Sequence, residues 1–255
     1  HMGRILIEGS EALPFLDYVA TNRFTNLKEG GALYTPICHE HGGCIDDSII
    51  YSHSSTKFSF VANAANRQKD LKHLIKYSKA FDVKITPLFE EGILALQGPL
   101  SKEVLQALTP SIKSLSFMQG LELDFQNQSL FIARTGYTGE LGYEIYGSDE
   151  TLKKIWNFLL KETDGKVQPI GLAARDLLRL EMGYALYGHE LSDQIHPTES
   201  VAKWAVKLDK EKFVGKESLL KRVHSDQKRD QYGIILLDQA IARQGYEVMI
   251  NGAKS

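Results

Sequence analysis

Residues 134–146 read Arg-Thr-Gly-Tyr-Thr-Gly-Glu-Leu-Gly-Tyr-Glu-Ile-Tyr, and they follow directly on the apolar run Ser129–Ala133. A strand that ends in a glycine-rich turn and then resumes is typical of a bend where backbone approaches backbone or a ligand closely. The glycine spacing is not G-x-G-x-x-G and no helical pattern follows at once, so a dinucleotide site is not indicated. The stretch predicts either an ordinary turn between two strands or a turn that aims side chains at a ligand.

The composition is that of a soluble globular chain with one large core or two domains. Its 255 residues carry 30 Lys and Arg against 32 Asp and Glu, and 43% of them are hydrophobic. Charges of both signs are interspersed, which argues against nucleic-acid binding, and the apolar runs are too short to span a membrane. Two cysteines suit a reducing compartment, and we expect no signal or transit segment.

The pattern along the chain alternates strand-like blocks with amphipathic helices. Ser10, Asn66, Ser101 and Ser148 stand where N-caps are expected. We predict strands at 4–7, 32–37, 44–51, 57–62, 81–85, 92–96, 121–125, 129–134, 143–146, 204–208, 232–237 and 246–250. We predict helices from 12 to 19, after 66, after 101, after 148, over 171–182 and up to 223, with a linker at 224–231. Apolar residues cover most sides of 171–182, which predicts a buried helix.

Two short polar segments raise the question of a site. Cys38-His-Glu-His-Gly-Gly-Cys44 holds two thiols and two imidazoles, but its spacing does not match known zinc motifs, so a glycine-containing turn is the favoured interpretation. Asp46 and Asp47 then open an apolar strand whose alternation sends their side chains to opposite faces. A carboxylate aimed at a core is costly unless it is paired or used. One member of this pair is therefore a candidate functional residue.

Tyrosines are numerous near candidate carboxylates at Asp47, Glu144 and Glu181. An aromatic slot with a few converging polar groups is how proteins hold flat heterocycles, although aromatic core packing explains the same composition. The tyrosines in question are Tyr34, Tyr51, Tyr137, Tyr143, Tyr146, Tyr184 and Tyr187. Neither a nucleophile elbow nor a phosphate-binding loop is present in the sequence.

Ten short strings, in the same order along the whole chain, resemble the aminomethyltransferase family, the T-proteins of the glycine cleavage system. They are His1-Met2-Gly3-Arg4, Gly42-Gly43 with Asp46-Asp47, Val61–Asn66, Leu96–Pro99, Arg134–Gly139, Gly171–Asp176, Leu180-Glu181 with Tyr184, Leu186–His189, Phe213–Lys216, and Arg243 with Gly245. Family members also have a segment before His-Met-Gly and further strands beyond the position of Ser255. By this resemblance His1-Met2 is native and the chain is an internal portion of a longer protein.

The resemblance implies a tetrahydrofolate-dependent reaction. The one-carbon unit on the aminomethyl-lipoyl arm of H-protein would pass to tetrahydrofolate, giving 5,10-methylenetetrahydrofolate and ammonia. Asp47 matches the family's catalytic aspartate. The folate-binding residues carried over by motif are Met2, Tyr34, Ile49, Asn63, Tyr137, Glu144, Arg175 and Tyr184. The implied partner is lipoylated H-protein, without metal, nucleic acid or membrane, in the cytoplasm of a bacterium or the mitochondrial matrix of a eukaryote.

The resemblance also implies an α+β fold of two interleaved mixed lobes around a central folate-binding channel. Residues 1–208 would form this region, and 209–255 would begin an incomplete C-terminal β domain. Two departures from the family pattern are Cys44, in place of an apolar residue, and the looser match at 198–200, where contacts with H-protein are expected.

Two other interpretations of the resemblance remain. The first is a non-catalytic folate-binding accessory protein of the same superfamily, of the iron-sulfur assembly type. Those proteins carry Lys-Gly-Cys-Tyr-x-Gly-Gln, whereas this chain has Glu181-Met-Gly-Tyr-Ala-Leu-Tyr187 without the cysteine. The second is the folate module of a sarcosine or dimethylglycine dehydrogenase, for which the chain shows no flavin-binding glycine fingerprint.

Overall fold

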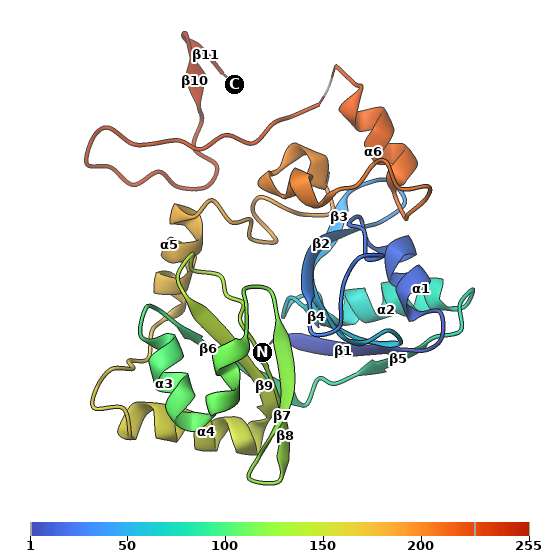
Figure 1. Cartoon of the computed structure of the whole chain (residues 1–255). Coiled ribbons are helices and arrows are strands. Elements are labelled where there is room, and N and C mark those ends of the chain that lie inside the picture. The colour runs from blue at the N-terminus through green and yellow to red at the C-terminus, as the bar shows by residue number, and fades with distance from the viewer. Residues whose placement is uncertain (1, 227, 255) are drawn as a thin grey trace.

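Two antiparallel sheets, each covered by helices, form the framework of the chain in a computed structural model that describes residues 2–226 and 228–254 (Figure 1). The strands are β1 (Gly3–Glu8), β2 (Ala32–Cys38), β3 (Cys44–Ser54), β4 (Lys57–Ala62), β5 (Lys84–Pro87), β6 (Glu91–Gln97), β7 (Gly120–Phe125), β8 (Gln128–Ala133), β9 (Gly142–Ser148), β10 (Met249–Ile250) and β11 (Ala253–Lys254). The α-helices are α1 (Ala12–Val19), α2 (Arg67–Ser78), α3 (Ser101–Leu108), α4 (Asp149–Lys161), α5 (Leu172–Glu181) and α6 (Lys216–Val223). The predicted mixed α+β class is confirmed.

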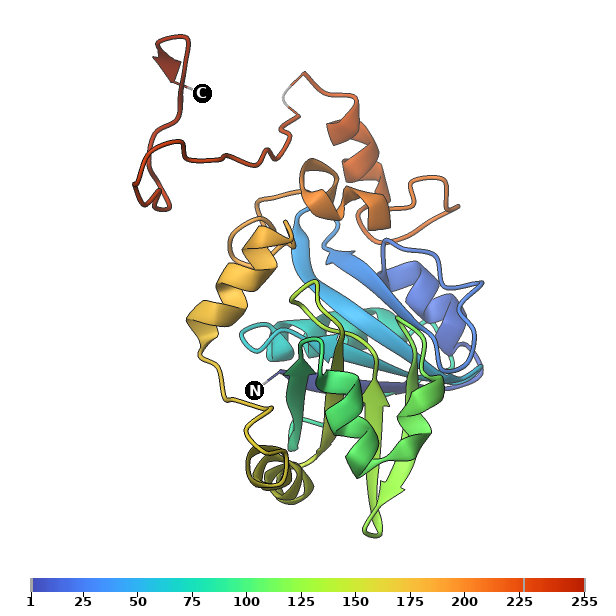
Figure 2. The same cartoon turned by 60° about the vertical axis from the view of Figure 1, so that its left-hand side comes forward.

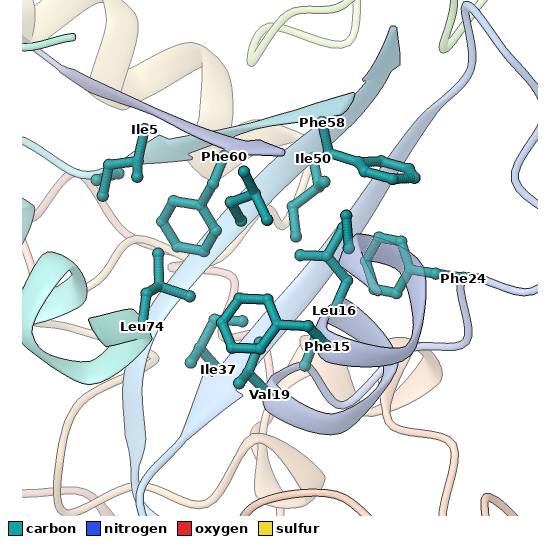
Figure 3. Packing of buried hydrophobic residues seen from close by; sticks show 14 residues of the cluster. Ile5, Phe15, Leu16, Val19, Phe24, Ile37, Ile50, Phe58, Phe60 and Leu74 are labelled. Atoms are coloured by element: carbon teal, nitrogen blue, oxygen red, sulfur yellow. The ribbon is translucent and has the colours of Figure 1, made fainter. Parts of the chain in front are cut away.

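The first sheet has the strand order β2-β3-β4-β1-β5 and lies under α1 and α2. β1 alternates buried and half-buried residues along its length, which is the period-two pattern of a strand with one core face. Its Ile5 and Ile7 join Phe58 and Phe60 of β4 and Phe15 of α1 in a core without solvent access (Figure 3). Burial of this face holds both helices against the sheet.

The second sheet has the order β6-β9-β8-β7, and α3 and α4 cover its outer face. α4 begins as predicted, because the Ser148 hydroxyl accepts a hydrogen bond from the backbone N–H of Thr151. Its residues Ile155 and Leu159 pack with Leu130, Ile132 and Ile145 of the sheet. The glycine-rich stretch 134–146 thus forms the loop between β8 and β9 and the first part of β9.

The inner faces of the two sheets pack against one another (Figure 2). Tyr51 of β3 contacts Phe131 of β8 and Tyr146 of β9, with ring centroids 5.0 and 5.7 Å apart. At one edge a backbone bridge joins Gly31, next to β2, to Gln119, next to β7. The inner face of β3 is therefore held against the second sheet.

Several local predictions are wrong. Residues 204–208 do not form a strand, because Val201–Ala205 is a 3-10 helix, and 232–237 pair with no strand among the described residues. Ser10 does not cap α1, since its hydroxyl donates to Asp82, and Asn66 caps α2 with its backbone position only. His1, and Gln227 in the predicted linker, lie outside the described residues.

The prediction that α5 is buried is also wrong. Leu172, Leu177 and Leu180 are 72%, 57% and 56% exposed, whereas Arg179 is the residue of α5 that is buried, at 4%. The guanidinium of Arg179 donates to Asp176, to Glu190 and to the carbonyl of Tyr184. Apolar residues on most sides of a helix predict its burial only where another part of the chain packs over that helix. None of the described helices is long and apolar enough to cross a membrane.

Candidate functional site

β3 places Asp47, Ile49 and Tyr51 on one face by strand alternation, and this face turns toward the second sheet. Tyr51 has no solvent access, while Asp47 and Ile49 are only partly buried. The opposite face of β3 carries Asp46 toward α2, where the side chain of Asn66 donates to it. The two neighbouring aspartates therefore point to opposite faces of β3, and the Asn63 side chain donates to both of them.

The carboxylate of Asp47 is held by two donors. The hydroxyl of Tyr34 donates to Oδ2 at 3.0 Å, and the amide of Asn63 donates to Oδ1 at 3.1 Å. Burial, followed by the negative charge of Asp46, raises the pKa of Asp47 from 3.8 to about 7, although both hydrogen bonds act in the opposite direction. A carboxyl group that ionises near neutral pH can accept a proton and return it under the same conditions.

Removing the Tyr34 hydroxyl tests this electrostatic balance. The hydrogen bond from Tyr34 stabilises the ionised form of Asp47, so Tyr34→Phe is expected to raise the pKa of Asp47 further above 7. If activity requires ionised Asp47, the acid limb of the pH–rate profile moves to higher pH. An NMR titration of labelled aspartate carboxyls checks the shift directly, and a downward shift would contradict the prediction.

Glu144 of β9 is the second carboxylate of the site, and its Oε2 atom accepts three hydroxyl hydrogen bonds. Thr135 lies at 2.6 Å, Tyr51 at 3.2 Å and Tyr146 at 3.3 Å. The side chain is partly exposed, and no hydrogen bond from the described residues goes to its Oε1 atom. Glu144 is thus fixed through one oxygen while the other is available to a donor group of a ligand.

Tyr137, Arg175 and Tyr184 form a second wall. The rings of Tyr137 and Tyr184 stack with centroids 5.8 Å apart at an interplanar angle of 25°, and the Arg175 guanidinium lies 4.5 Å from the centre of the Tyr137 ring. The hydroxyl of Tyr137 donates to the carbonyl of Ala185. Burial and the charge of Asp47 both raise the pKa of Tyr137, which places this wall within electrostatic reach of Asp47.

The remaining predicted residues lie on the shared inner face. Met2 and Ile49 pack against the cluster that contains Tyr51 and Tyr146, so they lie near the residues that hold Glu144. Asn63 follows β4 and reaches Asp47 through its side-chain amide. The structure therefore gathers the predicted residues around the inner face of β3 and the loop between β8 and β9.

Two residues that contact the candidate site have no signal in the sequence. Trp204 stacks on Tyr34 with ring centroids 5.6 Å apart, although the two residues are far apart along the chain, and the sequence predicts a strand at Trp204. Thr135 is the nearest donor to Glu144, but a threonine in a turn is unremarkable by itself. Only the three-dimensional packing identifies these two residues.

Two other features do not contribute to this site. A cavity of about 440 Å³ is lined by His189, Glu190, Glu199 and Arg229 with other residues, and none of the predicted folate residues belongs to it. Cys38 and Cys44 are free, buried and packed in two different apolar clusters. Within residues 2–226 and 228–254, no group of three or more His, Cys, Asp or Glu side chains is placed to hold a metal ion.

Comparison with known proteins agrees with this arrangement. The model of the GCVT N-terminal domain family matches residues 1–210. Aminomethyltransferase from Halothermothrix orenii is 40% identical over 254 residues, which cover 99% of this chain and 71% of the relative. Aminomethyltransferase from Listeria monocytogenes serotype 4a is 42% identical over 255 residues, with 98% and 69% covered.

A solved structure gives the same result. The crystal structure of glycine cleavage system aminomethyltransferase T from Bartonella henselae superposes with a TM-score of 0.81 at 36% identity, covering 88% of this chain and 61% of that one. The chain thus spans about 70% of these curated relatives and less than two thirds of the solved chain. The protein belongs to the aminomethyltransferase family of glycine cleavage T-proteins.

Proposed function

We propose that the protein transfers the one-carbon unit of aminomethyl-lipoyl H-protein to tetrahydrofolate, giving 5,10-methylenetetrahydrofolate and ammonia. Family membership supports the reaction class. The main structural support for the proposal is the carboxyl group of Asp47, which lies on the inner face of β3 and has a pKa of about 7. In a eukaryote this reaction would belong to the mitochondrial matrix, and in a bacterium to the cytoplasm.

Asp47 supplies the acid–base and electrostatic part of the reaction. Loss of ammonia develops positive charge on the transferred carbon, and a fixed carboxylate stabilises that charge. Near neutral pH the same carboxylate accepts the proton that a folate nitrogen loses when it takes the carbon. Tyr34 and Asn63 hold the carboxylate in one orientation for both roles.

The residues around Asp47 fit a reduced folate. The available oxygen of Glu144 suits the N–H donor edge of a pterin, and Tyr137, Tyr184, Met2 and Ile49 provide apolar surface for flat rings. Arg175 lies on Tyr137, and a guanidinium is suited to ordering rings and carboxylates rather than to proton transfer. We therefore assign it to ordering this wall and the carboxylate set. Bound folate would supply the nitrogen nucleophiles for the transfer.

Calorimetry with tetrahydrofolate tests the binding part of the proposal. We expect the protein to bind tetrahydrofolate whether or not a chelator is present, and Glu144→Gln to weaken binding by about tenfold or more, because a charge-assisted hydrogen bond is lost. Glu140→Gln, on the loop before β9, is the matched control because the side chain of Glu140 is exposed. Equal affinities of both variants would remove Glu144 from the site.

An assay of ammonia release distinguishes the transferase from the accessory-protein alternative. A transferase releases ammonia when aminomethylated H-protein and tetrahydrofolate are both supplied. A folate-binding accessory protein binds tetrahydrofolate but releases no ammonia above background.

We also propose that residues 1–208 form the folate-binding region and that residues 209–255 form the start of a C-terminal β domain.

A further inference from the structure

Asp70 on α2 is a buried acid without an evident partner. Its side chain is 2% exposed, and neither of its carboxyl oxygens accepts a hydrogen bond from any described residue. An ionised carboxylate left in this state would be strongly destabilising. We therefore infer that the carboxyl group of Asp70 is protonated and neutral in the folded protein.

Asp70 lies one helical turn after Asn66, whose side chain donates to Asp46, so the group that faces Asp70 is the carboxylate of Asp46. Asp46 has no solvent access and accepts three hydrogen bonds, from the backbone N–H of Asn63 at 2.9 Å, from the amide of Asn63 at 2.8 Å and from the amide of Asn66 at 2.6 Å. All three donors point at the two carboxyl oxygens of Asp46, so Asp46 acts as an acceptor in this cluster. Two neighbouring buried carboxyl groups cannot both ionise, so the proton stays on Asp70.

The other charged and titratable groups near Asp70 do not change this result. Burial raises the pKa of Asp70 to about 10, and the negative charge of Asp46 acts in the same direction. Lys69 on α2 opposes the shift, but its amino group donates to the hydroxyl of Tyr187. Burial lowers the pKa of His73, also on α2, to about 4, so this ring is neutral, and Asp47 adds a further negative charge.

We propose that Asp70 is a positioning residue that, as a neutral carboxylic acid, donates a hydrogen bond to Asp46 and thereby fixes the Asn63 amide on Asp47. One amide nitrogen of Asn63 donates to Oδ1 of Asp46 and to Oδ1 of Asp47, at 2.8 and 3.1 Å, so the two faces of β3 are linked through Asn63. No proton leaves Asp70 during this role. The inference rests on the proposed catalytic function of Asp47.

Stability measurements test the neutral state of Asp70 without reference to activity. A carboxyl whose pKa is raised on folding stabilises the protein fully below its ordinary value of 3.8, and this contribution is lost as pH rises toward about 10. Asp70→Asn keeps the shape and a donor but cannot ionise. Between pH 5 and 8 the folding equilibrium constant of Asp70→Asn should therefore gain on the wild type by about tenfold per pH unit.

Urea unfolding at pH 5, 6, 7 and 8 provides this comparison, with Asp164→Asn as the control. Asp164 is exposed and adopts a φ of 51°, a backbone conformation that asparagine tolerates, so its ratio to the wild type should stay flat. A flat or falling ratio for Asp70→Asn would mean that Asp70 is ionised in the folded protein and would overturn the proposal.

The kcat values of two variants then show whether Asp70 acts as a hydrogen-bond donor or only fills space. Asp70→Leu keeps the branching of the side chain, although it is larger, and has no donor. It should lower kcat by about tenfold or more, since the charge-assisted hydrogen bond to Asp46 is lost. Asp70→Asn should restore most of that loss, while tetrahydrofolate affinity changes little in either variant. Equal losses in the two variants would overturn the donor role. If the wild type itself releases no ammonia, the proposed function fails, whereas the pH dependence of stability still decides the state of Asp70.

Discussion

Asp47→Asn is expected to lower the rate of ammonia release by about 10²-fold or more while the affinity for tetrahydrofolate changes much less. The amide keeps the size of the side chain and part of its hydrogen bonding with Tyr34 and Asn63. It loses the negative charge and the ability to accept a proton, which matter most as charge develops in the transition state. The effect should therefore fall on kcat rather than on binding.

The measurement is ammonia release from aminomethylated H-protein at saturating tetrahydrofolate, using the complete native protein. Burial raises the pKa of Asp47 to about 7, so the charged form is costly in the folded state and Asp47→Asn should not lower the melting temperature at neutral pH. A loss of turnover in a protein that melts no earlier than the wild type is then chemical. Wild-type turnover itself should decline as pH falls through about 7, because Asp47 becomes protonated.

Asp46→Asn is the companion variant. We expect it to reduce stability strongly and to lower the rate far less than Asp47→Asn does. Asp46 is fully buried and accepts three hydrogen bonds from Asn63 and Asn66. In Asp46→Asn the new N–H₂ group would point at these donors, so at least one of them would lose its acceptor. Near-normal turnover for Asp47→Asn together with a collapse of turnover in a stable Asp46→Asn protein would show that the two roles are exchanged.

The sequence predicts most of the framework because local patterns carry it. β1 and the helices that start at Ala12 and Asp149 show the periods of two and 3.6 that reflect one buried face each. Residues 204–208 have the composition of a strand, yet the backbone turns there in a 3-10 helix that lies against β2. Strand composition indicates a pleated, half-buried surface and does not ensure that a neighbouring strand is present.

The sequence likewise predicts one part of the candidate site and not the other. The physical argument about a carboxylate on a buried strand points to one of Asp46 and Asp47. The family resemblance selects Asp47 and supplies the surrounding folate residues. The supporting contacts depend on packing between distant segments: Asn66 turns its amide to Asp46 instead of capping α2, and Thr135 secures Glu144. Such hydrogen bonds join positions whose spacing has no period, so a single sequence does not reveal them.

Lys210→Met is expected to cause a large loss of stability. Lys210 is 5% exposed, and its amino group donates to the backbone carbonyls of Asp17, Ala20 and Asn22 around the C-terminal end of α1. Methionine fills a similar volume but leaves these carbonyls without their donor. Buried, unsatisfied carbonyls cost about 1–3 kcal/mol each, so a total loss of about 3 kcal/mol or more is expected.

Thermal and urea unfolding measure this loss, which corresponds to a decrease in melting temperature of about 6–12 °C for a domain of this size. Lys212→Met is the matched control, because Lys212 is exposed and its effect should stay within about 0.5 kcal/mol. The experiment also bears on the proposed boundary at residue 208, since Lys210 lies beyond it in sequence but satisfies α1. A change below about 1 kcal/mol for Lys210→Met would mean that water replaces the lysine and that residues after 208 contribute little to the stability of the first sheet and its helices.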